Sequence, residues 1–414
     1  MQTLQKMVNV LLLIPNLGNG GAQSVFRSHL DHLGKFANVT GCLFNWDGSL
    51  PTDHEKGIIS LDVPAGSTFL SKIYFFLKRI EKVKKIKRER KIQITISHLE
   101  GADYINVLSK TSDRTICWIH GTKQHDLAIN GIIGWVRIHL LIPLLYKKAD
   151  KIVTVCKELG IEMDVNIKGI SKRIKTIYNG FDVEKIIAFS KEELSPSQQE
   201  LFNQRTILIA HCRLAPQKNL RALLHVFAEI RKKDKTAILV LIGDGELRSD
   251  LSKLCFQLNL RPSHASEFNS LTSHHQIDVA FLGYQSNPFK FLSKASAFLM
   301  TSSWEGFPLA LCEAMACGNF VFCADCHTGP REIMAPEIEL NSPRLAKPHR
   351  NKYGYLMPLV SEEDNSTIIT WANVIVEEIA LGCPGNHRRE DSINRIKEFD
   401  YSHFVNASIE IIRE

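Results

Sequence analysis

Short apolar runs alternate with amphipathic stretches along most of this chain of 414 residues. The first run, VNVLLLIP from Val8 to Pro15, predicts a buried strand, which Pro15 and the following Asn16 end. Apolar residues at helical spacing follow from Ala22 and predict a helix. Similar runs lie at residues 93–101, 114–121 and 151–156, and an Asn-Gly turn closes 173–182. Strands that alternate with helices in this way predict a doubly wound parallel sheet.

The alternation starts again after the polar stretch KEELSPSQQELFNQ. Apolar runs at residues 205–214, 237–246 and 319–325 predict strands, as do VAFLGY and SAFLMTSS, and NLRALLHVFAEIRKK predicts an amphipathic helix. A chain of this length suits two domains of about 150–200 residues. We therefore expect an α/β protein with two Rossmann-like domains, whose ligands bind at the carboxyl ends of the strands, in a cleft between the domains.

Composition narrows the class of protein. The 51 basic and 44 acidic residues give a net charge of +7, which suits a phosphorylated ligand or an anionic membrane surface and falls short of a dedicated nucleic-acid binder. Ten scattered cysteines predict no disulfide framework, and Cys323 and Cys326 form a lone C-x-x-C without a second pair at zinc spacing. The sequence shows no signal peptide and no membrane span, so we expect a cytoplasmic protein, soluble or peripheral on a membrane.

The stretch FLMTSSWEGFPLALCEAMACG, residues 298–318, carries two acids around a helix start. Pro308 fits the first helical position and Gly318 fits just past the last one. The free amides of a helix N-terminus attract anions, but two carboxylates beside a bound phosphate would repel it. We therefore expect Glu305 and Glu313 to accept hydrogen bonds from neutral hydroxyls. A nucleotide sugar or a sugar phosphate carries both groups. The alternative, that both are surface acids near a helix dipole, stays open on this pattern alone.

Two cations follow the first strand of the second half, in AHCRLAPQKNL. Arg213 stands where the strand ends and Lys218 just before the next helix, so both project from the edge of the sheet that holds the acids. Arginine binds phosphate oxygens in a bidentate manner and lysine adds a point charge, and together they could neutralise a diphosphate leaving group. Each alone could equally be a solvated surface cation.

The first half offers a glycine-rich turn and a histidine. Gly18, Gly20 and Gly21 let the backbone approach a ligand closely, although they do not complete a dinucleotide-binding G-x-G-x-x-G. His120 ends the strand TICWIHG, where an imidazole can hydrogen-bond a sugar or move a proton. The sequence has no D-x-D motif that would hold a divalent ion over a diphosphate, so we expect no metal ion and no other cofactor, with Arg213 and Lys218 in the place of a metal.

The combination of E-G-F-P-x4-E-A-M-A-x-G with R-L-x3-K-N resembles the retaining GT-B glycosyltransferases that carry the E-x7-E signature, known as glycosyltransferase family 4. GNGGAQ, ADKIVTVCKE, IYNGFD, LIGDGELR and FLGYQSNPFKFLSKASAFLMTSS support the likeness, which runs from about Val8 to Glu332. The resemblance implies that Arg213 and Lys218 hold the donor diphosphate, that Glu305 contacts the transferred sugar and that Glu313 contacts the ribose.

The resemblance implies further site residues and a domain layout. Gly20, Gly21 and His120 would line the sugar and acceptor side, and the donor site would include three residues beside the signature: Gly306, Phe307 and Leu309. The catalytic set would be His120, Arg213, Lys218 and Glu305. We expect an acceptor-side domain over residues 1–190, a donor domain over 200–385, and a C-terminal helix, 386–414, that crosses back to the first domain.

The expected reaction transfers a hexose or N-acetylhexosamine, with retention of configuration, from a UDP-linked donor to a hydroxyl of a lipid-carried or surface-glycan acceptor, as in bacterial lipopolysaccharide, O-antigen and polysaccharide synthesis. The segment CHTGPRE, residues 326–332, departs from the usual Gly-Gly and resembles the subgroup that builds on lipid carriers. Polar inserts are expected at 261–278 and 336–353. A GT-B sugar-nucleotide epimerase, a phosphorylase and a non-catalytic scaffold for glycan assembly are the rival hypotheses.

The stretch FLSKIYFFLKRIEKVKKIKRERK, residues 69–91, is a basic amphipathic helix by its pattern. Between Lys72 and Lys91 it has ten basic residues and two acids, and Ile73, Leu77, Ile80, Val83 and Ile86 form one apolar stripe. This composition favours an interfacial helix on an anionic membrane, on the inner face of the cytoplasmic membrane. Alternatively, the stripe packs on the first domain and the lysines are solvated. Aromatic residues occur only at its start, which argues against nucleic acid as a partner.

Overall fold

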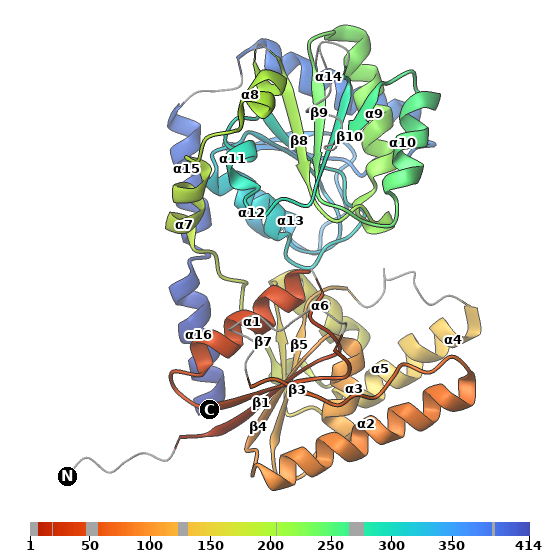
Figure 1. The fold of residues 1–414 in the computed structure, drawn as a ribbon, viewed down its shortest axis with the longest axis vertical. Coiled ribbons are helices and arrows are strands. Elements are labelled where there is room, and N and C mark those ends of the chain that lie inside the picture. Colours follow the sequence, from red (N-terminus) through yellow and green to blue (C-terminus); the bar gives the residue numbers. More distant parts are fainter. Residues whose placement is uncertain are drawn as a thin grey trace, which may run out of the picture. The chain divides into compact units, whose positions relative to one another are not determined.

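The computed structural model describes residues 7–18, 20–46, 57–122, 131–203, 205–264, 277–382 and 386–414. The chain divides into two compact units, which are described separately here (Figure 1). The first unit consists of Met1–Gly180 together with Ser402–Glu414, and the second of Phe181–Tyr401.

The first unit is built on a parallel sheet in the order β3-β2-β1-β4-β5-β6-β7. Its central strands are buried because helices cover both faces of the sheet; β1 is a nearly continuous apolar run, whereas β4 also buries Thr95, Ser97 and His98. The strands are β1 (Asn9–Ile14), β2 (Asn38–Leu43), β3 (Ile59–Ser60), β4 (Ile94–His98), β5 (Arg114–Ile119), β6 (Lys151–Thr154) and β7 (Ile174–Thr176).

The helices of the first unit include a row in which α2 (Phe69–Glu89) and α5 (Ile142–Tyr146) both contact α3 (Glu100–Leu108). The C-terminal helix α16 (Tyr401–Arg413) packs in this unit, where the Phe404 ring lies against Trp118 of β5. The remaining helices are α1 (Gly21–Leu33), α4 (Gly131–Val136), the π-helical turn η2 (Arg137–Leu141), α6 (Lys157–Asn166) and the 3₁₀ turn η3 (Ser171–Arg173).

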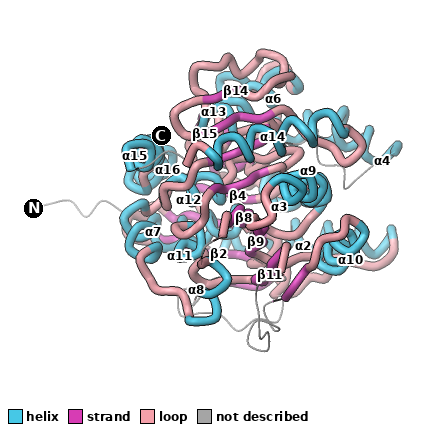
Figure 2. Tube along the Cα trace, turned by 90° about the horizontal axis from the view of Figure 1, so that it is seen from above, coloured by secondary structure: helices cyan, strands magenta, loops and turns pink. Residues whose placement is uncertain are grey.

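The second unit has a sheet in the order β10-β11-β9-β8-β12-β13-β15-β14, parallel except for the pairing of β14 with β15. Helices lie on either side of its strands (Figure 2). The strands are β8 (Ile207–His211), β9 (Ile238–Ile242), β10 (Pro262–His264), β11 (Val279–Gly283), β12 (Ala297–Met300), β13 (Val321–Ala324), β14 (His349–Arg350) and β15 (Gly354–Met357).

The helices of the second unit fall into two groups by their mutual contacts. One group is α9 (Leu220–Lys233), α10 (Arg248–Gln257) and α14 (Asn365–Ala380), and the other is α7 (Val183–Ser190), α11 (Phe289–Leu292), α12 (Leu309–Ala316) and α15 (Asn386–Lys397). Shorter pieces are α8 (Pro196–Phe202), η4 (Pro216–Lys218) and α13 (Pro330–Met334). Leu223, Phe227 and Trp371 are central to the core under α9 and α14.

Both sheets confirm the predicted class, an α/β protein with two doubly wound parallel sheets. In each sheet the chain crosses from one half of the sheet to the other, between β1 and β4 in the first and between β8 and β12 in the second. The carboxyl ends of the two strands flanking such a crossing, where the strand order reverses, leave a crevice, where ligands of doubly wound proteins bind. The strand order therefore points to the loops after β8 and β12. These loops hold five of the candidate residues: Arg213, Lys218, Glu305, Gly306 and Phe307.

The structure adds detail where the sequence pattern was least informative. Two helices, α15 and α16, occupy the stretch 386–414, where one helix was expected. At the junction between them, Tyr401 donates its backbone N–H to Phe181 O. Within the insert 336–353, the buried Arg331 guanidinium donates to backbone oxygens of Glu339, Ser342 and Pro343. In the insert 261–278, residues 262–264 form β10, and 265–276 lie outside the described residues. Among the described helices, none has the length and apolar content that crossing a bilayer requires.

Candidate functional site

The loop after β8 carries Arg213 and Lys218 and is tied to the neighbouring strand β12. Lys218 ends the short turn η4, and Asn219 adopts a left-handed backbone, with φ of 52°, to start α9. Thr301, just past β12, donates its hydroxyl to the backbone oxygens of Lys218 and Asn219, both at 3.2 Å. The two loops at the reversal point therefore form one hydrogen-bonded assembly.

The Gly-Asp-Gly turn after β9 supports the Arg213 backbone. Leu214 N donates to Asp244 O at 3.0 Å, and Leu247 N donates to Leu214 O at 3.0 Å. Gly243 has a φ of 124°, and a β-carbon there would collide with Cys212 O, so this turn requires glycine. The contact holds the backbone of Arg213 in place while its side chain stays exposed. Within the described part of the chain, the Arg213 guanidinium has no ion-pair or hydrogen-bond partner.

Lys218 and Glu305 form a direct ion pair, with Lys218 Nζ 2.7 Å from Glu305 Oε1. Their side chains are 19% and 7% exposed, so the pair is largely shielded from water. Burial alone would lower the pKa of Lys218, but the Glu305 carboxylate outweighs it and raises this pKa above its ordinary value. Lys218 therefore remains a cation at the site, and the structure brings together two of the four residues singled out in the second half.

The backbone of Glu305 is clamped by the loop after β13. Glu305 N donates to His327 O at 2.7 Å, and the Thr328 hydroxyl donates to Glu305 O. Thr328 and Gly329 both have positive φ, 60° and 96°, and a β-carbon on Gly329 would lie 2.8 Å from Gly306 O. The segment that departs from the usual Gly-Gly thus still supplies a left-handed turn that closes over the Glu305 loop.

Glu313 lies on α12 and faces the end of β8. Its Oε2 is 3.3 Å from Nδ1 of His211, the last residue of β8. His211 Nδ1 is buried and makes no hydrogen bond, because its geometry relative to Glu313 Oε2 does not allow one. Buried polar atoms are seldom left unsatisfied, and those that are often mark a place where a ligand binds. Pattern analysis missed His211 because it sits inside an apolar strand.

The rest of the signature stretch builds the helix start. Pro308 is the N-cap of α12 rather than its first helical residue, and no side chain caps this end, while Gly318 follows the helix with a φ of 82° as expected. Phe307 is buried between Phe181 and Phe399, with ring centroids 6.1 and 5.2 Å away. Its ring is therefore a packing anchor, and ligand contact in this stretch would come from backbone amides. Gly306 is buried and Leu309 half-buried.

The three candidates of the first half all lie in the first unit. Gly20 is the N-cap of α1 with an extended backbone, φ of −175°, and Gly21 starts the helix; both are exposed. His120 follows β5, is half-buried, and its Nε2 lies 2.8 Å from Nδ1 of His98. Gly20 and Gly21 leave the amides of α1 without a side-chain cap. Asn19 lies outside the described residues.

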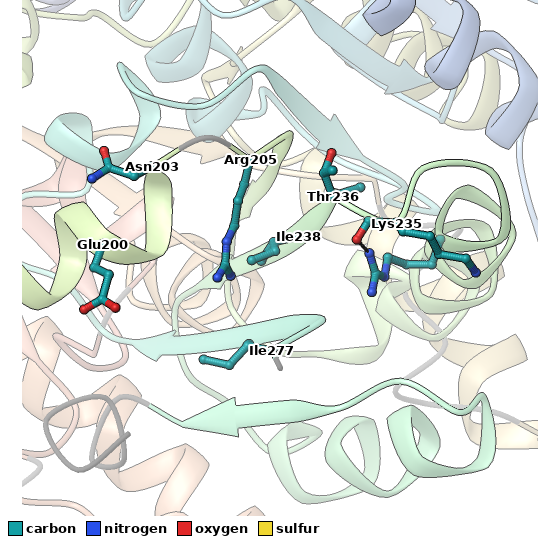
Figure 3. A pocket seen from close by; sticks show the side chains of 9 residues that line it. Glu200, Asn203, Arg205, Lys235, Thr236, Ile238 and Ile277 are labelled. Carbon is teal, nitrogen blue, oxygen red and sulfur yellow. Dashed lines mark hydrogen bonds between the residues drawn. The ribbon is translucent and has the colours of Figure 1, made fainter. Parts of the chain in front are cut away.

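A separate cavity of about 310 Å³ lies at the other edge of the second sheet (Figure 3). It is lined by residues at the amino ends of β8, β9 and β11, among them Arg205, Ile238 and Ile277. The lining includes three cations, Arg205, Arg231 and Lys235, and one acid, Glu200. None of the candidate residues lines it, and ligands of doubly wound sheets bind at the carboxyl edge, so we assign it no role in the site.

The cysteines and acids do not build a metal centre in the described ranges. No group of three or more His, Cys, Asp or Glu side chains there has the arrangement to hold a metal ion. Cys323 and Cys326, the lone C-x-x-C, are buried, and burial holds the pKa of both thiols well above the ordinary value. They therefore pack as apolar groups around the Glu305 loop.

Comparison with known proteins places this geometry in context. Residues 191–342 match the family model described as "Glycosyl transferases group 1". An uncharacterized glycosyltransferase of Methanocaldococcus jannaschii is 31% identical over 296 residues, 69% of this chain and 68% of that protein. A 4-alpha-N-acetylgalactosaminyltransferase of Campylobacter jejuni, whose named substrate is a diphospho-undecaprenol-linked sugar, is 29% identical over 197 residues, 48% of this chain and 47% of its own.

Among solved structures, that of HepE from Anabaena in complex with UDP aligns with a TM-score of 0.73 over 98% of this chain and 100% of that one, at 16% sequence identity. A likeness at this identity shows the fold. The fold is accordingly GT-B, as predicted.

Proposed function

Because the chain belongs to the group 1 glycosyl transferases, we propose that it moves a hexose or N-acetylhexosamine from a nucleoside diphosphate sugar to a hydroxyl of a lipid-carried or surface-glycan acceptor. UDP is the nucleotide we expect, a choice supported by the HepE structure with UDP. The acceptor class is supported by the Campylobacter relative, whose name specifies a polyprenyl diphosphate carrier. Lipopolysaccharide and related surface polysaccharides are the products that such an acceptor implies.

The observation that carries the proposal is the pairing of Lys218 with Glu305 at the point where the strand order reverses, in a loop that also carries the exposed Arg213. A carboxylate offset by an ammonium 2.7 Å away can stand next to a diphosphate without net repulsion. It can then accept hydrogen bonds from sugar hydroxyls. Arg213, without a protein partner in the described residues, is available to bind phosphate oxygens. Glu313, beside the unsatisfied His211, would accept from the ribose hydroxyls.

In this mechanism the acceptor oxygen forms a bond to the anomeric carbon while the bond from that carbon to the diphosphate breaks. Negative charge grows on the leaving oxygen, where Arg213 and Lys218 stabilise it. The acceptor proton passes to that same leaving oxygen, so attack comes from the face that the diphosphate leaves and the configuration is retained. Glu305 is engaged with Lys218, which favours a role as hydrogen-bond acceptor over one as covalent nucleophile.

Release of UDP from candidate donors, with and without acceptor, tests the site. Arg213→Ala should lower kcat/KM by on the order of 10²–10³-fold, because one preorganised partner of the developing charge is lost. The variant should fold normally since Arg213 is exposed. Arg221→Ala is the matched control: it removes an arginine from the following helix that pairs with Glu362. Unchanged turnover in Arg213→Ala would refute the site assignment, and a donor panel read by mass spectrometry would identify the sugar.

We also propose a peripheral contact with anionic membrane through the amino-terminal half of α2, on the inner face of the cytoplasmic membrane. Phe69, Leu70, Tyr74 and Leu77 are 75%, 77%, 60% and 58% exposed, an unusual density of exposed apolar groups on one helix. Lys72 lies among them and Lys78 and Arg79 follow directly, so basic charge adjoins the apolar groups as on interfacial helices. Four apolar residues of α4, η2 and α5 in the same unit are similarly exposed: Trp135, Leu140, Leu141 and Leu144.

A further inference from the structure

Three histidines and a serine form a continuous row inside the first unit, which we call the histidine row. His98 Nδ1 lies 2.8 Å from His120 Nε2, and His98 Nε2 lies 3.2 Å from His29 Nδ1. His29 Nε2 lies 3.2 Å from Ser408 Oγ. The members come from the end of β4, the loop after β5, α1 and α16, so four elements far apart in the sequence build it.

The row is buried everywhere except at His120. His29 and His98 are fully buried, and Ser408 is 1% exposed. The Phe404 ring stacks on His29 at 5.0 Å between centroids, and Trp118 meets the same ring edge-on at 4.5 Å. His120 is half-buried, which makes it the member that a ligand can reach. The aromatic packing fixes the orientation of His29 and His98.

Both inner histidines are neutral. Burial lowers the pKa of His29 to about 3, with a further contribution from His32, and burial holds the pKa of His98 well below its ordinary value. A neutral imidazole has one N–H donor and one acceptor nitrogen. Both nitrogens of His29 and of His98 are engaged in the row, so each of these rings donates on one side and accepts on the other. All hydrogen bonds of the row therefore donate toward His120, or all donate toward Ser408.

Ser408 decides between these two directions. In the described residues its hydroxyl has no hydrogen-bond partner other than His29. If His29 donated to Ser408, the buried hydroxyl proton would have no acceptor, an arrangement that proteins rarely tolerate. The hydroxyl therefore donates to His29 Nε2, His29 Nδ1–H donates to His98 Nε2, and His98 Nδ1–H donates to His120 Nε2.

We propose that His98 is a positioning residue that holds neutral His120 in its Nδ1–H form, so that His120 offers a hydrogen-bond donor, not a base, to the sugar or acceptor. His29 and Ser408 set the direction of the row. The inference rests on the proposed function and on the expectation from the sequence that His120 lines the sugar and acceptor side. Of the two roles open to His120, hydrogen-bonding a sugar and moving a proton, this inference selects the first. The acceptor proton then passes to the departing diphosphate, as in the proposed mechanism.

Nitrogen-15 NMR of the full chain, labelled at histidine and with the His120 signals assigned through His120→Gln, tests the inference directly. We expect a protonated Nδ1 and an unprotonated Nε2 on His120. His98→Phe removes the donor but keeps a ring, so His120 should shift toward the Nε2–H form that free imidazole prefers. His29→Phe deletes the donor that fixes the direction of the row, so it should also weaken the preference of His120 for the Nδ1–H form. His225→Phe is the control: it removes an imidazole of the second unit and should leave the form of His120 unchanged.

An Nε2–H form of His120 in the unaltered protein overturns the proposal, and that measurement decides the matter even where His98→Phe fails to fold. So does an unchanged His120 in a folded His98→Phe variant. A transfer assay then separates the two hypotheses. His120→Gln keeps a donor and should retain more activity than His120→Ala. If the NMR result is as expected but His120→Ala transfers at the full rate, the row stands and the proposed site assignment fails at His120.

Discussion

Thr328 and Gly329 show how one pair of residues shapes the candidate site. Both have left-handed backbones, and together they close the Glu305 loop through the Thr328 hydroxyl and His327 O. A sequence pattern identifies Gly329 as a turn residue, but a threonine with positive φ has no local signal because β-branched residues avoid that region. Arg213, Lys218 and Glu305 could be found because strand ends and a helix start mark them, whereas His211 and Thr328 could not.

Gly329→Ala should destabilise the protein by about 1–3 kcal/mol, because strain at positive φ adds to a close approach to Gly306 O. Urea denaturation of the full chain measures the change in the free energy of unfolding. Gly382→Ala is the control, with a similar φ of 89° and no atom within 4 Å of the new β-carbon. Equal losses in both variants would show that the contact with the Glu305 loop is without consequence.

Lys87 provides a second test at the scale of one residue. It belongs to the basic run of α2, yet its side chain is fully buried, with Nζ 2.8 Å from Asp113 Oδ2. Lys87→Met should cost about 3–5 kcal/mol of unfolding free energy because it leaves Asp113 buried without its cation. Lys85→Met, on the same helix at a position that is 73% exposed, should change stability by less than about 0.5 kcal/mol. A small effect of Lys87→Met would mean that Asp113 is satisfied by Thr95 and Thr111 alone.

At the scale of the element, the apolar stripe of α2 is buried along one half of the helix and exposed along the other. Its second half packs on the first sheet: Val83 is fully buried and Ile80 and Ile86 pack against the same core. Its first half leaves Ile73 and Leu77 exposed, although they continue the same stripe. The helical spacing of apolar residues in the sequence identified the stripe correctly. It could not show which part of the stripe is buried, because burial depends on where α3 and the sheet lie against α2.

Binding to vesicles follows from the exposed half of α2. We expect the protein to sediment with vesicles that contain phosphatidylglycerol more strongly than with pure phosphatidylcholine, since apolar insertion and basic charge act together. Exchanging Phe69, Leu70 and Leu77 for serine should abolish this binding and leave the fold unchanged. Phe256→Ser is the control, because Phe256 is 66% exposed on α10 in the other unit. Equal binding by both variants would rule out α2 as the contact.

At the scale of the whole molecule, alternating strands and helices made both sheets predictable. The expected central strands occur, because buried parallel strands are continuous apolar runs. The edge strands β3 and β14, and β2 beside β3, gave weaker signals, since they are short or partly polar. The hydrogen-bonded partners across distant segments, as in the histidine row, follow from the three-dimensional packing and have no local pattern.

Buried neutral histidines make stability depend on pH. His29 binds a proton near pH 6.5 when unfolded but only near pH 3 when folded, so the unfolded state holds more protons between these values. The free energy of unfolding should be unaffected above about pH 7 and fall by up to about 1.4 kcal/mol per pH unit and per histidine below pH 6.5. Urea denaturation from pH 7.5 to 5 measures the slope. His29→Phe should reduce it, and an identical slope would contradict the neutral state of His29.

The membership of Ser402–Glu414 in the first unit has a consequence for how the protein is made. These residues are synthesised after all of Phe181–Tyr401, so the first unit stays incomplete on the ribosome until the second has been made. Until then, Trp118 of β5 lacks its contact with Phe404, and Arg114 lacks its hydrogen bond to Ile411 O. A ribosome that stops short of Ser402 releases a product whose earlier half is the incomplete one. Quality control that senses exposed apolar surface would then detect a late truncation through the part of the chain that was made first.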